Sequence, residues 1–409
     1  MKRIWTPLIA LASGLVPSLA SAVIIYDDGA VHTIDTPVTE SVRVGDTTTV
    51  RVISGGTITG DGSTTGLIET RGALSTERNT FNHRIDLEGN AHVQGGLERF
   101  GIARSLGGRL SITDNSVVDA GLTGTAIYGL GFSPGPGIPT TPTLRTSLGG
   151  NARVNGNVQT DGIIEISGNA FINGTLSEVN SGIILFMSGG TIAGNVRTAN
   201  NIDHIVSLTG GEILGNFGSG AALVSTMDFS MQDGRIAGSW SVNSRNMNVD
   251  IRGGSIEGGM TFSDAAGAYG TNSNIAFFGG AIDTSIGSWL FDFGPTNPIF
   301  NSGSCASNHT SFDIWGGQFG YSSAGLGMRL DQCATVDVYG TGLLYAGGLL
   351  TGTLADGSLL NLSVTEVGTW MGAIRLHDVS VPEPGTLGLF AMMLGGLVFA
   401  RRRQVATLA

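Results

Sequence analysis

Single β-branched residues recur along the chain between small or polar neighbours, and glycines close each of these units. One copy runs from Gly189 to Gly194 and reads Gly-Gly-Thr-Ile-Ala-Gly. Alternation of apolar and polar positions over a few residues is typical of a short strand, and glycine permits turns with positive φ. No segment between the two ends of the sequence has a sustained apolar stripe of helical period. The pattern therefore predicts short strands separated by tight turns.

The unit returns with a period near twenty residues. A sister form carries Asn-Ala in place of the second glycine, as at Asn90, Asn151 and Asn169. A period of this length indicates a repeat architecture. Twenty residues at about 3.3 Å each are enough for one coil of three short strands and three turns. The glycines that close the regular copies are Gly156, Gly174, Gly194, Gly215, Gly238 and Gly258.

We therefore predict an all-β fold, a single-stranded parallel β-helix (β-solenoid) with coils of about 20 residues. Coils stacked about 4.8 Å apart would place one apolar residue of each coil in an inner ladder. A glycine-rich disordered chain is the alternative, but the apolar positions recur in phase with the glycines. The 66 glycines show no three-residue period, which excludes collagen. The predicted ladder comprises Ile58, Val93, Ile172, Ile192, Ile213, Ile236 and Ile256.

The pattern divides the chain into four regions. Residues 1–22 are predicted to be a signal peptide, 23–52 an N-terminal cap, 53–375 the β-helix and 381–403 a C-terminal tail. Two irregular, proline-containing segments at 129–148 and 294–311 interrupt the repeat, and proline is excluded from central strands. We expect both segments to be loop insertions. The apolar stretch 343–364 is expected to form the closing coils and the C-terminal cap.

The first 22 residues have the three parts of a secretory signal. Lys2 and Arg3 supply the charged start, an apolar stretch follows, and Ala20 and Ala22 form a small-residue cleavage site for signal peptidase. A membrane anchor is the alternative reading, but Pro17 and the polar sequence after residue 22 favour export followed by cleavage. In an exported chain, the two cysteines at 305 and 333 are expected to form a disulfide, Cys305–Cys333.

The charge of the chain narrows the range of partners. The formal net charge is −11, and Lys2 is the only lysine. An acidic body of this kind is a poor partner for nucleic acid or for an anionic membrane surface. It could attract divalent cations diffusely, which is a weaker statement than a defined calcium site.

The end of the sequence holds the most specific signal. Pro382, Glu383 and Pro384 are followed by sixteen uncharged, mostly apolar residues, and then by the basic cluster Arg401, Arg402 and Arg403. A membrane span needs about 20 residues, so this stretch predicts a short transmembrane helix with interfacial flanks. Arginines beyond a span hold that end in the cytoplasm, which leaves the body of the protein on the far side.

This order resembles the PEP-CTERM sorting tail of Gram-negative bacteria. By this resemblance, Pro382, Glu383 and Pro384 form the motif recognised by an exosortase, a membrane-embedded cysteine transpeptidase-like enzyme. The enzyme would release the protein from an inner-membrane intermediate towards the cell surface or the extracellular space. The resemblance implies a destination, associated with exopolysaccharide and biofilm formation, and it assigns no activity to the body. A plain C-terminal anchor is the alternative.

Parallel β-helices also host polysaccharide lyases and hydrolases. A hydrolase needs two carboxylates a few ångströms apart, one of them with a raised pKa. Of the acids in the regular repeat, only Glu257 and Asp283 share a column, and no lysine in the body could act as a base. We therefore expect no catalytic residue, no metal and no cofactor. The six histidines have no metal-ligand spacing: His32, His83, His92, His204, His309 and His377.

The leading hypothesis is a non-enzymatic, exported surface or matrix protein that contacts exopolysaccharide or neighbouring proteins through the two insertions. The first alternative is a carbohydrate-active β-helix enzyme, because the fold alone establishes no chemistry. The second alternative is a matrix former that associates with copies of itself. The sequence names neither the polysaccharide nor the oligomeric state.

Overall fold

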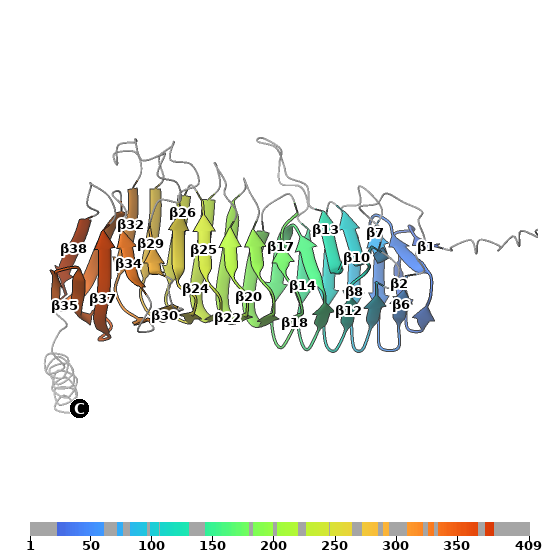
Figure 1. Cartoon of the computed structure of the whole chain (residues 1–409). Coiled ribbons are helices and arrows are strands. Elements are labelled where there is room, and N and C mark those ends of the chain that lie inside the picture. Colours follow the sequence, from blue (N-terminus) through green and yellow to red (C-terminus); the bar gives the residue numbers. More distant parts are fainter. Residues whose placement is uncertain are drawn as a thin grey trace, which may run out of the picture.

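The structure is a computed structural model of the 409-residue chain. All regular elements of the described residues are strands, β1 to β38. They form one elongated solenoid with β1 (Val23–Tyr26) near one end and β38 (Ala373–Asp378) near the other (Figure 1). The structure describes residues 23–379 except 61–71, 77–81, 96–98, 106, 131–143, 180–182, 199–202, 220–225, 245, 264–271, 285–288, 294–308, 322–325, 331–333 and 367–372.

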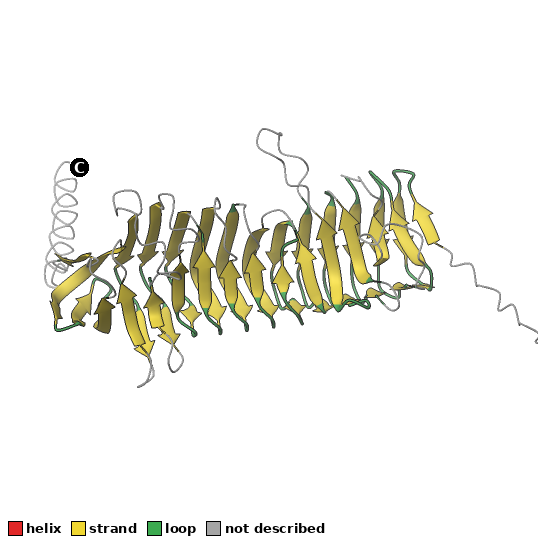
Figure 2. Cartoon of the chain, turned by 45° about the horizontal axis from the view of Figure 1, so that its top comes forward, coloured by secondary structure: helices red, strands yellow, loops and turns green. Residues whose placement is uncertain are grey.

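Each coil contributes strands to three faces, and each strand pairs in parallel with the equivalent strand of the next coil (Figure 2). The predicted all-β parallel solenoid is therefore confirmed. The first face consists of β1, β4 (Ser41–Val44), β7 (Gly72–Thr76), β10 (Phe100–Ser105), β13 (Thr125–Leu130), β16 (Asn157–Thr160), β19 (Leu176–Ser177), β21 (Val196–Thr198), β23 (Phe217–Ser219), β25 (Trp240–Asn243), β28 (Met260–Ser263), β31 (Trp289–Asp292), β34 (Leu326–Leu330) and β37 (Leu359–Glu366).

The second and third faces follow the same order. The second face consists of β2 (Val31–Ile34), β5 (Thr49–Val52), β8 (Arg84–Leu87), β11 (Arg109–Ile112), β14 (Arg145–Leu148), β17 (Gly162–Ile166), β20 (Ile183–Ile192), β22 (His204–Ile213), β24 (Thr226–Ile236), β26 (Asn246–Ile251), β29 (Asn272–Phe277), β32 (His309–Ile314), β35 (Ala334–Ala346) and β38. The third face consists of β3 (Pro37–Val38), β6 (Thr57–Thr59), β9 (His92–Gln94), β12 (Val117–Asp119), β15 (Arg153–Asn155), β18 (Phe171–Ile172), the ends of β20, β22 and β24, β27 (Ser255–Ile256), β30 (Ala281–Thr284) and β33 (Gln318–Tyr321).

The inner ladder of the third face contains all seven residues predicted for it. Their side chains are buried, because the alternation of the strand turns one residue of each rung into the solenoid. The register adds further residues to this ladder. These are Val118, Val154, Ile282 and Phe319.

The two forms of the repeat correspond to two turns between the second and third faces. In the Asn-Ala form, Gly168 has φ 62°, and the asparagine after it points along the solenoid. The side chain of Asn169 donates to the Oδ1 of Asn151 at 3.0 Å, and Asn151 donates to Asn115 at 3.0 Å. Asn115 in turn donates to Asn90 at 3.2 Å. The asparagines are therefore a hydrogen-bonded ladder that ties successive turns together.

The glycines that close the repeat lie at the corner between the third and first faces. A Cβ on Gly174, Gly194 or Gly238 would lie 2.4, 2.5 or 2.6 Å from the carbonyl oxygen of the glycine one coil earlier. Real Cβ atoms do not approach backbone oxygens this closely, so only glycine allows the coils to stack at this corner. The glycines recur about every twenty residues because one of them is needed at this corner in each coil.

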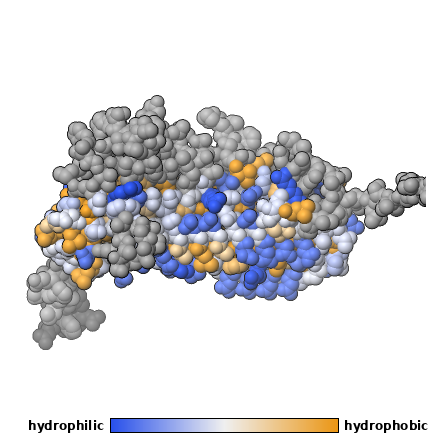
Figure 3. Space-filling view, in the orientation of Figure 1, coloured by the Kyte–Doolittle hydropathy of each residue, from blue (hydrophilic) through white to orange (hydrophobic). Residues whose placement is uncertain are grey.

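The last coil is closed by an antiparallel sheet. β36 (Leu349–Leu354) pairs antiparallel with both β35 and β37, and it buries Leu350 and Leu354 against the end of the core. Leu349 and Leu359 remain exposed, and Figure 3 shows hydrophobic residues gathered at this end of the solenoid. At the other end, residues 23–52, expected to be an N-terminal cap, form β1 to β5 and pair coil on coil.

Candidate functional site

Two aspartates stack on the outer side of the second face. Asp313 of β32 is directly opposite Asp337 of β35 in the parallel register. The sequence pattern placed only Glu257 and Asp283 in one column, so it did not predict the pair of Asp313 and Asp337. The insertion between β31 and β32 separates these coils from the regular repeat, so the period did not align them. The two tripeptides Asp313-Ile314-Trp315 and Asp337-Val338-Tyr339 were the sequence signal that could have shown the pairing.

The environment of the two carboxyl groups differs. Burial raises the pKa of Asp313, and the neighbouring Asp337 raises it further, while His377 opposes the shift. Asp337 accepts a hydrogen bond at 2.6 Å from the Nε2 of His377 on β38. The pair therefore combines a carboxyl group that holds its proton to higher pH with one that is bound to an imidazole. A carboxyl group with a raised pKa beside a second carboxyl group is a feature found at acid–base sites, and also in structural networks.

An aromatic row runs beside the aspartates. The Trp315 and Tyr339 rings stack with centroids 3.6 Å apart, and Tyr339 stacks on His377 at 4.5 Å. Burial, followed by Asp313 and Asp337, raises the pKa of the Tyr339 hydroxyl. Because the rings lie face to face along the solenoid, their faces contact one another. The row is therefore a structural stack.

Glu257 and Asp283, the acid pair that the repeat pattern predicted, have a different environment from Asp313 and Asp337. Glu257 accepts hydrogen bonds from Arg235 at 2.6 and 2.8 Å, and these bonds lower its pKa. Asp283 follows in the next coil, in line with Glu257. Because the carboxylate of Glu257 is fixed in its ionised form by the guanidinium, it is poorly suited to donate a proton.

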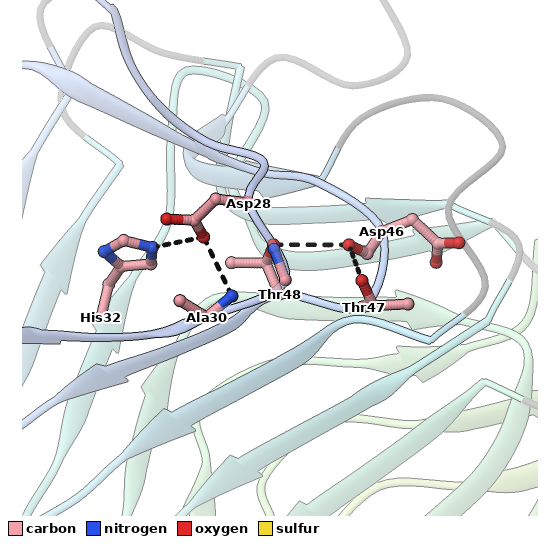
Figure 4. A network of polar contacts seen from close by, with 7 residues as sticks. Asp28, Ala30, His32, Asp46, Thr47 and Thr48 are labelled. Atoms are coloured by element: carbon pink, nitrogen blue, oxygen red, sulfur yellow. Dashed lines mark hydrogen bonds and ion pairs between the residues drawn. The ribbon is translucent and has the colours of Figure 1, made fainter.

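The N-terminal end has a polar network of its own (Figure 4). Asp28 accepts hydrogen bonds from the Nε2 of His32 at 2.8 Å and from the backbone N–H of Ala30 at 2.9 Å. The bond from His32 lowers the pKa of Asp28. His32 also stacks on Tyr26 at 4.1 Å. The network fixes the first turn of the chain, and it resembles the His92–Asp119 pair, which joins two coils at 2.6 Å.

Charged side chains also lie inside the solenoid. Arg104 is completely buried, burial lowers its pKa to about 9, and its Nη1 donates to the carbonyl oxygen of Arg145 at 3.0 Å. The Glu178 Oε2 and the His204 Nδ1 lie 3.4 Å apart, and both side chains are buried. These groups are closed to a macromolecular ligand, and we assign them to the structure of the coils.

The residues of the predicted sorting, processing and disulfide sites all lie outside the described residues. This applies to Ala20 and Ala22, to Pro382, Glu383 and Pro384, to Arg401, Arg402 and Arg403, and to Cys305 and Cys333. In the sequence, Cys305 falls between β31 and β32, and Cys333 falls between β34 and β35. The disulfide remains a prediction. Within the described residues, no group of three His, Cys, Asp or Glu side chains could hold a metal ion.

Comparison with known protein families matches residues 380–404 to the PEP-CTERM protein-sorting motif. The chain is therefore a PEP-CTERM sorting-motif protein, exported and sorted by exosortase-type machinery through a membrane-associated intermediate. The matched segment begins two residues after β38. No curated protein and no solved structure matches the chain. None of the described residues forms a helix long and apolar enough to cross a membrane, and the predicted transmembrane helix lies outside them.

We expect Asp313→Asn to stabilise the protein at pH 7. The folded-state pKa of Asp313 is raised, so its ionised form weakens the folded state once the pH exceeds the unfolded value near 3.8. Because the side chain is partly exposed, the gain should stay below about 1 kcal/mol, or about 2 °C in Tm. Thermal melts of both proteins from pH 3 to pH 8 measure the difference, which should vanish below about pH 4. If the variant melted at a lower temperature than the native protein at pH 7, the expected stabilisation would be contradicted.

Proposed function

We propose that the protein is a non-enzymatic component of the cell surface or the extracellular matrix that binds exopolysaccharide. The observation that carries the proposal is the direct succession of an elongated solenoid and a PEP-CTERM motif. The motif supports delivery to the outside, and the solenoid supports a rigid, extended body there. The cell envelope of a Gram-negative bacterium is the location that this proposal requires.

The two insertions are the proposed polysaccharide contacts. The predicted bounds of 129–148 and 294–311 were too wide, because residues 129–130 belong to β13, 145–148 to β14 and 309–311 to β32. The remaining segments, 131–143 and 294–308, each connect a strand of the first face to a strand of the second face. Long connections in compact domains are often binding loops, because a rigid scaffold positions them at little cost to the fold. Connections between the same two faces would let one extended polymer contact both insertions.

The test replaces 131–143 and 294–308 by short Gly-Ser linkers in the exported chain. Binding to exopolysaccharide purified from the host should fall at least tenfold, measured by co-sedimentation and by biolayer interferometry. The second replacement also removes Cys305, so Cys305→Ser serves as the matched control and should bind normally. Unchanged binding by the doubly replaced chain would refute these contacts.

A carbohydrate-active enzyme is the second candidate, and the aspartate pair of β32 and β35 favours it. Asp313, with its raised pKa, would be the proton donor, and Asp337 would be the second carboxylate. Release of reducing ends from host polysaccharide should then be lost in Asp313→Asn and in Asp337→Asn, and retained in Asp283→Asn. Equal release by the native protein and by the two variants would exclude this role.

A further inference from the structure

The outer side of the second face changes its chemistry along the solenoid. The register aligns two outward rows across successive coils. The first row reads Arg84, Arg109, Arg145, Ile163, Ile184, Ile205 and Asp228. The second row reads Arg51, Asp86, Ser111, Ser147, Glu165, Phe186, Ser207, Ser230, Asp250, Ala276, Asp313 and Asp337. In the first row three arginines precede the apolar centre and Asp228 follows it. In the second row the acids Asp250, Asp313 and Asp337 follow the centre, while Arg51 on the other side is accompanied by Asp86 and Glu165.

The apolar centre is a contiguous surface. Phe186 is 43% exposed and Ile205 is 40% exposed, and the partly exposed Ile163 and Ile184 are aligned with Ile205 in the first row. Single exposed apolar residues are ordinary on a protein surface, whereas these four are neighbours on three successive strands and form one contiguous apolar patch.

We propose that this face is the interface of a two-fold symmetric dimer of the protein. An isologous interface must be self-complementary, so that a patch meets its own copy and each flank meets the other flank. A two-fold axis lying in the interface along β20 fulfils this requirement. This axis makes the two solenoids run in opposite directions, while each row of one copy still faces the same row of the other copy. A strand that lies a given number of coils before β20 in one copy then faces the strand that lies the same number of coils after β20 in the second copy. The facing strands are β17 and β22, β14 and β24, β11 and β26, and β5 and β32.

The pairs that this axis creates are complementary in the centre and on both sides. Phe186 meets Phe186 of the second copy, and Ile163 meets Ile205. Beyond them, Arg145 on β14 meets Asp228 on β24, because each lies two strands from β20 in the first row. The same operation sets Arg51 against Asp313 in the second row.

The arginines on the basic side can bind a second acid. Arg145 holds Glu165, and Arg51 holds Glu88 at 2.7 Å, yet each guanidinium has five donor N–H groups. Arg109, which is exposed, makes no ion pair among the described residues. The two-fold axis places it opposite Asn248 of the second copy, on the strand that also carries Asp250, which Arg252 binds at 2.9 Å.

The size of the face fits a specific dimer. From β5 to β32 the strands span about 50 Å at about 4.8 Å each, and the strand width of about five residues is about 16 Å. The product is about 800 Å² per copy, which equals the usual contribution of one partner to a stable interface. The proposal concerns a different surface from the insertions and does not depend on polysaccharide binding.

Sedimentation velocity of the exported, processed chain at several concentrations tests the proposal. We expect a dimer at low salt, weakened at 1 M salt because the flanking ion pairs are screened. Phe186→Asp should raise the dimer Kd at least about a hundredfold, since each interface loses the contact twice. Leu214→Asp is the matched control: Leu214 is 41% exposed and follows the inner residue of the third face, and its variant should dimerise normally.

A charge exchange tests the orientation of the two copies. Arg145→Asp should weaken the dimer, and adding Asp228→Arg in the same chain should restore most of the affinity. Circular dichroism and thermal melting confirm that each variant is folded. A monomer at all concentrations would overturn the dimer, and a failure of the double variant to recover would overturn this axis.

Discussion

Replacing Trp240 by alanine is expected to lower the free energy of unfolding by about 3–5 kcal/mol. Trp240 is completely buried on β25, and its ring lies 5.5 Å from that of Phe229 and 5.2 Å from that of Phe262. Truncation would remove the largest side chain of this cluster and leave a cavity that three neighbouring coils cannot close, since each coil is fixed by its ladders. Urea unfolding followed by circular dichroism measures the loss.

Trp240→Phe is the matched control. The indole Nε1 of Trp240 finds no acceptor among the described residues, so phenylalanine removes a buried donor that lacks a partner. This gain offsets part of the lost volume, and the variant should unfold within about 1 kcal/mol of the native protein. Equal losses for both variants would mean that the indole N–H is bonded and that the aromatic packing is secondary.

Particular residues show how far the sequence determines the fold. The ladder from Ile58 to Ile256 was predicted because β-branched residues and glycines recur at one interval, and both are fixed by contacts between neighbouring coils. Trp240 and Phe229 could not be assigned to one cluster, since they lie on different faces and their contact depends on how the coil closes. The same limit applies to the polar residues inside, such as Arg104.

The candidate sites also differ in how far they can be predicted from the sequence. The sorting motif was predicted from Pro382 to Pro384 because it is read from contiguous residues. The pair of Asp313 and Asp337 was missed because its formation depends on the register of two coils that irregular connections separate. The second face likewise acquires its basic, apolar and acidic parts only when the rungs are aligned. A site formed by contiguous residues can therefore be predicted from the sequence. A site formed by residues of successive coils can be predicted only when the strand register is known.

Gly211→Ala is the second substitution expected to have a large effect, with a loss of about 3 kcal/mol in the free energy of unfolding. Gly211 has φ 83°, a conformation that costs a residue with a Cβ about 1–2 kcal/mol. A Cβ there would also lie 2.6 Å from the carbonyl oxygen of Gly189 in the preceding coil. That oxygen belongs to the backbone of a paired turn, so relief requires the two coils to separate locally.

Gly357→Ala separates the two causes. Gly357 has φ 89° in the turn after β36, and a Cβ there would meet nothing within 4 Å. Its variant should therefore lose only the conformational part, about 1 kcal/mol. Urea midpoints of the two variants measure the difference, which reports the cost of the contact between stacked coils. If both variants lost the same free energy, backbone conformation alone would explain the glycines, and close stacking would not be the reason for the repeat.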